Sequence, residues 1–188
     1  MDIEKRNKLF NLMISTGSIK FGKFTLASGR ESSYYCDGRI ASTHPDTAPL
    51  IGQLLLQIMD ENNLQPDSIG GLETGAIPIV GQVQAAAHYL GQRPLKSFYV
   101  RKQPKGHGTK SQIEGNFKSS DKVVIFEDVT TSGTSAGIAL DAVLLKEATV
   151  CAVICLLDRQ EGAQEYFKQR GIPFYPLFTK QEFLNQKK

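Results

Sequence analysis

Residues 123–137 of this chain read VVIFEDVTTSGTSAG. The segment begins with a short apolar, β-branched run, which is typical of a strand buried on both faces of a sheet. Two carboxylates follow, Glu127 and Asp128, and then a loop rich in hydroxyl groups that opens a helix at about residue 134. This order of strand, polar loop and helix predicts one unit of an α/β fold.

Strand-like and helix-like segments alternate on either side of this unit. The expected strands are residues 67–72, 96–101, 122–126, 149–157 and 173–178. The expected helices are residues 77–90, 134–146, 161–170 and 179–186. Such alternation, with nearly continuous apolar strands, implies a parallel sheet covered by helices on both faces. We therefore predict an α/β fold with a Rossmann-like central parallel sheet.

The N-terminal part follows a different pattern. Residues 2–15 read as an amphipathic helix with Asp2 as its N-cap and Gly17 as its stop. Residues 19–36 read as short strand-like pieces, and residues 46–62 as a second helix with an apolar face. A chain of 188 residues is long enough for one domain with a sizeable core, and we expect a single domain.

Composition argues against several classes of protein. The net charge is only +3, and no long basic run stands out, so we expect no nucleic-acid partner. The three cysteines, Cys36, Cys151 and Cys155, lack the spacing of a disulfide framework or a zinc site. The charged N-terminus is unlike a secretory signal, and no apolar stretch is long enough to span a bilayer. We therefore expect a cytoplasmic protein without a membrane partner.

The loop after the acidic pair has the composition of a phosphate site. It consists of Thr130, Thr131, Ser132, Gly133, Thr134 and Ser135. Hydroxyls and backbone N–H groups at a helix N-terminus suit a phosphate monoester, and adjacent carboxylates suit the vicinal hydroxyls of a ribose. The alternative is that the hydroxyl residues merely cap a helix. Neither GxxxxGK[ST] nor GxGxxG is present, so the common nucleotide-binding loops are not expected.

A second segment, residues 101–115, reads RKQPKGHGTKSQIEG. Its basic residues are Arg101, Lys102, Lys105, His107 and Lys110. Cations among glycines and a proline are typical of a lid that closes on a polyphosphate and stabilises a leaving pyrophosphate. Lys105 and His107 are candidates to supply a proton to the leaving oxygen. The alternative is an ordinary solvated surface loop.

Four loops follow the expected strands, and each begins at a carboxyl end. They are residues 73–76, 102–115, 127–135 and 158–160. Because ligands bind at the carboxyl ends of parallel strands, we expect the chemistry at that edge. Arg159 in the last loop offers a guanidinium suited to a carboxylate, although an ordinary surface pair with Asp158 is the alternative.

The motifs together resemble a known family. Segment 123–137 resembles the phosphoribosyl pyrophosphate signature of the type I phosphoribosyltransferases, with Glu127 at the first acidic position. The spacing R-K-x-x-K-x-H-G at 101–108 and the sequence D-R-Q-E at 158–161 narrow the resemblance to the orotate phosphoribosyltransferases. Residues 22–39 resemble the hood of that family, so residues 1–40 would contribute a hood over the base site.

The resemblance implies transfer of ribose 5-phosphate from phosphoribosyl pyrophosphate to orotate, giving orotidine 5'-phosphate and pyrophosphate in pyrimidine biosynthesis. The catalytic residues would be Lys105, His107, Glu127 and Asp128. Phosphoribosyl pyrophosphate would be bound by Arg101, Lys102, Lys105, His107, Glu127, Asp128, Val129, Thr130, Thr131, Ser132, Gly133, Thr134 and Ser135. Orotate would be bound by Thr131, Arg159 and Tyr35, and both Tyr34 and Tyr35 are candidates to pack on the planar base.

The same resemblance implies Mg²⁺ as cofactor and a homodimer in which the 102–115 loop reaches the neighbouring site. No cluster of ligands suggests an all-protein cage, so the ion would be held mainly by substrate. Ala27 and Gly75 stand where some members place a lysine, which shifts pyrophosphate binding toward the basic loop. Two other functions stay open: transfer to a purine base, and non-catalytic sensing of phosphoribosyl pyrophosphate.

Overall fold

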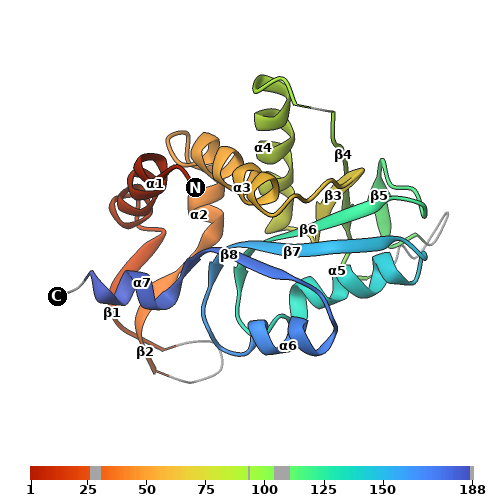
Figure 1. Ribbon diagram of the computed structural model, residues 1–188. Coiled ribbons are helices and arrows are strands. Elements are labelled where there is room, and N and C mark those ends of the chain that lie inside the picture. Colours follow the sequence, from red (N-terminus) through yellow and green to blue (C-terminus); the bar gives the residue numbers. More distant parts are fainter. Residues whose placement is uncertain (26–30, 93, 104–110, 187–188) are drawn as a thin grey trace.

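The computed structural model describes residues 1–25, 31–92, 94–103 and 111–186 (Figure 1). Its main sheet contains, in spatial order, β5 (Ile113–Gly115), β4 (Lys96–Val100), β3 (Ser68–Gly71), β6 (Lys122–Thr130), β7 (Thr149–Asp158) and β8 (Phe174–Thr179). β3, β4, β6, β7 and β8 run parallel, and β5 pairs antiparallel with β4 at one edge. The predicted α/β fold with a central parallel sheet is confirmed.

Helices cover both faces of this sheet (Figure 1). One face carries α1 (Ile3–Ser15), α3 (Ala48–Glu61), α4 (Ala76–Tyr89) and α7 (Lys180–Asn185). The other face carries α5 (Thr134–Leu144) and α6 (Ala163–Gln169). β6 shows why its sequence is apolar without interruption: Val124 and Phe126 pack into the first core, while Val123 and Ile125 pack into the second.

A two-stranded antiparallel sheet lies apart from the main sheet. It is formed by β1 (Ile19–Thr25) and β2 (Glu31–Cys36). α1 leads into it: the Asp2 carboxylate caps that helix by accepting the Lys5 N–H at 3.0 Å, and Gly17 follows the helix with a left-handed φ of 79°. α2 (Gly38–Thr43) then joins the small sheet to α3.

Three local features differ from the sequence-based expectation. β6 continues through the acidic pair to Thr130, because β7 pairs with it as far as Asp158. β5 forms inside a segment expected to be a loop, because Ile113 is buried and pairs with Val100. α2 was not expected; the Asp37 carboxylate caps it by accepting the Arg39 N–H. Within the ranges that the structure describes, no helix is long and apolar enough to cross a membrane.

Candidate active site

The carboxyl ends of β3, β4, β6 and β7 meet at one edge of the sheet, as the strand order predicts. Two hydrogen bonds join the loops that begin there. The Arg159 N–H donates to the Thr130 carbonyl at 2.9 Å, which connects the loops after β7 and β6. The Lys102 N–H donates to Oε1 of Glu73 at 3.0 Å, which connects the loops after β4 and β3. The described parts of the four loops therefore lie around one region.

The hydroxyl-rich loop between β6 and α5 encloses a small cavity of about 60 Å³. Its lining consists of Glu127, Val129, Thr130, Thr131, Ser132, Gly133, Thr134, Ser135 and Ala136. Gly133 adopts a left-handed φ of 89°, and a Cβ there would lie only 2.8 Å from Cδ1 of Tyr166, so glycine is required. The loop turns into α5 directly after Gly133, which presents helix-terminal N–H groups to the cavity as a phosphate site requires.

Glu127 is buried at the inner wall of this cavity, with 5% of its surface exposed. Its Oε2 makes no hydrogen bond in the part of the chain that the structure describes. Burial, and secondly the neighbouring Asp128 carboxylate, raises the pKa of Glu127 well above its ordinary value. The Glu127 side chain is thus a buried acid that lines the phosphate-loop cavity, and one of its oxygens has no hydrogen-bond partner among the described residues.

Asp128 occupies a different setting, because successive strand residues point to opposite sides. Its Oδ1 accepts the Val129 N–H at 2.8 Å. A Cβ added to Gly75 would lie 2.5 Å from Oδ1 of Asp128, and one added to Gly38 would lie 2.9 Å from Oδ2. The Asp128 carboxylate therefore fits between two glycines, one in the loop after β3 and one at the start of α2.

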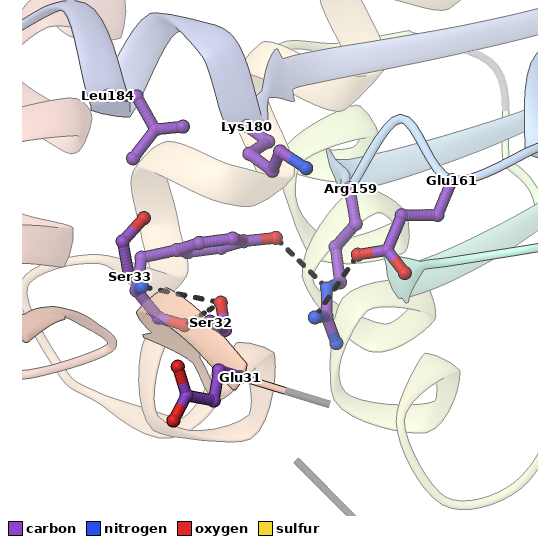
Figure 2. Close-up of a pocket in the computed structure, with 8 residues that line it drawn as sticks. Glu31, Ser32, Ser33, Arg159, Glu161, Lys180 and Leu184 are labelled. Atoms are coloured by element: carbon purple, nitrogen blue, oxygen red, sulfur yellow. Dashed lines mark hydrogen bonds and ion pairs between the residues drawn. The ribbon is translucent and has the colours of Figure 1, made fainter. Parts of the chain in front are cut away.

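A larger cavity of about 330 Å³ lies beside Arg159 (Figure 2). The Arg159 Nε donates to the Tyr34 hydroxyl at 2.9 Å, and its Nη2 lies 3.3 Å from Oε1 of Glu161. Burial raises the pKa of Tyr34, whereas the Arg159 guanidinium acts in the opposite direction. Lys180 of α7 also lines the cavity. The described lining thus combines two cations and an aromatic ring with two carboxylates, Glu31 and Glu161, and its guanidinium and ring suit a planar ligand.

The two neighbouring tyrosines lie on opposite sides of β2. Tyr34 is buried and contacts Arg159, while Tyr35 is 38% exposed and packs against Phe24 at 5.7 Å between ring centroids. Alternation along the strand explains this difference. Two charged residues of this cavity were not predicted to be site residues: Glu161, which lies within the D-R-Q-E segment, and Lys180, which no sequence motif marks.

The remaining predicted residues fall into three groups. Thr131 lines the phosphate-loop cavity rather than the Arg159 cavity. The Arg101 backbone is held by Gln112 through two hydrogen bonds of 2.9 Å. The Lys102 charge acts to lower the pKa of Glu127, against the larger effect of burial. The predicted Lys105, His107 and Lys110, and also Ala27, lie outside the described residues. In the parts that are described, no three His, Cys, Asp or Glu side chains cluster as a metal site.

Known proteins resemble this chain over nearly its whole length. No family model matches it. The orotate phosphoribosyltransferase of Methanocaldococcus jannaschii is 38% identical over 180 residues, covering 96% of this chain and 97% of the relative. The orotate phosphoribosyltransferase of Pyrococcus horikoshii is 41% identical over 177 residues, covering 93% and 91%.

Solved structures agree. The crystal structure of Mycobacterium tuberculosis orotate phosphoribosyltransferase in complex with 5-phospho-alpha-D-ribosyl 1-diphosphate has a TM-score of 0.78 and 30% sequence identity, covering 93% of this chain and 96% of that chain. Sequence and structure relatives thus point to the same family as the motifs do. This chain belongs to the orotate phosphoribosyltransferase family.

Proposed function

We propose that this protein transfers ribose 5-phosphate from phosphoribosyl pyrophosphate to orotate, giving orotidine 5'-phosphate and pyrophosphate in pyrimidine biosynthesis. One observation carries the proposal: the phosphate loop before α5 and the Arg159 cavity open at the same sheet edge and are joined by the Arg159–Thr130 hydrogen bond. The family relationship supports the same reaction, and a mycobacterial relative was solved with phosphoribosyl pyrophosphate.

Each part of the substrates matches a part of this edge. The loop from Thr130 to Ser135 would hold the 5-phosphate with backbone N–H groups and hydroxyls. Glu127 and Asp128 would accept hydrogen bonds from the ribose hydroxyls. Arg159 would bind the base through its guanidinium. Thr131 and Tyr35 are the other predicted base contacts, but the Arg159 cavity is lined by Tyr34 and by neither of them.

The chemistry needs no protein nucleophile. The bond between the anomeric carbon and pyrophosphate breaks through an oxocarbenium-like state, by analogy with glycosidic cleavage. The orotate ring nitrogen forms the new bond from the opposite face. Negative charge then develops on the leaving pyrophosphate, and the cations of the basic loop would stabilise it. The residues proposed for this role are Arg101, Lys102, Lys105 and His107.

A magnesium ion fits this edge as a group carried by the substrate. The described residues hold no cluster of three metal-ligating side chains, yet the unbonded Oε2 of Glu127 and the nearby Asp128 leave carboxylate oxygens for ribose hydroxyls around the ion. We therefore propose that these two residues lie near the ion without enclosing it. When bound, Mg²⁺ would neutralise charge on the pyrophosphate.

We also propose a cytoplasmic homodimer in which residues 102–115 are shared across the interface. Residues 1–188 would act as one domain, with residues 1–40 as a hood over the base site. The contact between Tyr34 of β2 and Arg159 supports the proposed hood, because it brings the small N-terminal sheet to the base cavity.

An absorbance assay with two control samples tests the proposed reaction. Purified protein, Mg²⁺ and phosphoribosyl pyrophosphate are mixed with orotate, and the loss of orotate absorbance is followed, with samples lacking either phosphoribosyl pyrophosphate or Mg²⁺ as controls. We expect orotate loss only in the complete mixture. A folded sample that consumes no orotate would favour a non-catalytic sensor of phosphoribosyl pyrophosphate and refute the proposal.

A further inference from the structure

Lys180 lies in the cavity that holds Arg159, although it follows β8, whereas Arg159 follows the neighbouring β7 (Figure 2). It is the first residue of α7. Its Nζ is 5.9 Å from the centroid of the Tyr34 ring, and the Arg159 Cζ is 5.6 Å from the same centroid. Two cations thus share one aromatic ring in a cavity large enough for a ligand.

Contacts between backbone and side chains hold Lys180 at this position. The Gln181 N–H donates to Oε1 of Gln160 at 3.0 Å, which ties the start of α7 to the loop that carries Arg159. In the sheet, Thr179 pairs in register with Asp158. The Lys180 backbone is therefore fixed relative to Arg159.

The charges around the cavity show why a second cation is needed. The Arg159 guanidinium is already paired with Glu161, at 3.3 Å, and Glu31 adds a second carboxylate to the lining. Among the lining residues that the structure describes, loss of Lys180 would leave two carboxylates and one guanidinium, which disfavours an anionic base. Lys180 itself forms no ion pair with any residue that the structure describes.

We infer that Lys180 is a specificity-determining residue whose ammonium, together with the Arg159 guanidinium, binds the carboxylate of the base. This inference rests on the proposed function, because the carboxylate belongs to orotate. An ionised carboxylate accepts several hydrogen bonds, so it can be shared between a planar guanidinium fork and a point-like ammonium. Lys180 would then add to the preference for a base that carries a carboxylate.

Binding of two nucleotides tests this role. Orotidine 5'-phosphate and uridine 5'-phosphate differ only in the base carboxylate, and their dissociation constants are measured by calorimetry on the wild type, Lys180→Met and Lys180→Arg. We expect Lys180→Met to weaken orotidine 5'-phosphate about tenfold, which corresponds to 1.4 kcal/mol, and to leave uridine 5'-phosphate within about twofold. Lys180→Arg should stay within about threefold of the wild type for both.

A matched control and the opposite results complete the test. Lys168→Met removes an exposed lysine from α6, outside the cavity, and should change neither constant. If Lys180→Met weakens both nucleotides equally, or neither, Lys180 only covers Tyr34 and the inference is overturned. Lys180→Gln repeats the comparison if the methionine variant does not fold. A wild type that turns over no orotate overturns the proposed function itself, whereas an active wild type with an unchanged ratio in Lys180→Met overturns only the inference.

Discussion

Glutamine in place of Glu127 tests what burial does to the acidic pair. Burial and the Asp128 carboxylate raise the pKa of Glu127 well above its ordinary value. The folded protein therefore binds this proton more tightly than the unfolded chain does. The stability from this linkage is fully present below the unfolded pKa and is lost as the pH rises through the folded pKa. Glu127→Gln removes the loss, because an amide does not ionise.

The size of the effect follows from the setting of Glu127. The unfolded pKa of a glutamate is about 4.3, and each pH unit between the unfolded and folded values costs at most about 1.4 kcal/mol. An unsatisfied buried polar group typically costs about 1–3 kcal/mol, and a charged one costs more. We therefore expect Glu127→Gln to match the wild type within about 0.5 kcal/mol at pH 4.5 and to be more stable by at least about 1–2 kcal/mol at pH 8.

Urea unfolding followed by circular dichroism at both pH values measures this difference. The exposed Glu4 on α1 provides the control, because Glu4→Gln should show no such dependence on pH. Activity should move the other way: we expect kcat/KM of Glu127→Gln to fall at least about tenfold, since a carboxylate proposed to bind ribose is lost. A stability difference that is independent of pH, or a Glu127→Gln protein that is less stable than the wild type at pH 8, would refute the proposed effect of burial on Glu127.

Three further substitutions test other parts of the site. Gly75→Ala places a Cβ 2.5 Å from Oδ1 of Asp128 and should lower kcat/KM about tenfold or more. The control is Gly81→Ala, whose Cβ meets nothing within 4 Å and which should leave steady-state kinetics unchanged. Lys105→Ala should fold normally but lose most turnover, and mixing it with Asp128→Asn subunits should restore partial activity if the basic loop acts across a dimer. No recovery in verified heterodimers would argue for sites built within one chain. Arg159→Lys should raise KM for orotate about tenfold and leave KM for phosphoribosyl pyrophosphate within about twofold, because lysine cannot form the planar, two-pronged hydrogen bonds of a guanidinium. Equal changes in both KM values would contradict a base-binding role for Arg159.

Sequence reasoning predicted the sheet edge correctly for a simple physical reason. The apolar run before Glu127 is long enough for a buried strand, and parallel strands bring their carboxyl ends together whatever their spatial order. The helix bounds also agreed closely, because caps such as Asp2 and stops such as Gly17 act within a few residues.

Features set by distant residues escaped prediction. An acidic residue at a strand end is ordinarily solvated, but β7 continues beside Glu127 and the phosphate loop folds over it, so it is buried. The choice between the two tyrosines of β2 depends on which of them meets Arg159, a contact across 125 residues of sequence. Lys180 joins the cavity only through the packing of the last helix. None of these contacts leaves a local pattern in the sequence.

Competition between bases shows directly which base the protein uses. The wild-type protein, Mg²⁺ and a limiting amount of phosphoribosyl pyrophosphate are incubated with equal concentrations of orotate, adenine, guanine and hypoxanthine, and the nucleotide products are identified by mass spectrometry. We predict orotidine 5'-phosphate as the single product, formed in the same amount as pyrophosphate. A purine nucleotide as the main product, or no nucleotide at all from folded protein, would contradict transfer to orotate.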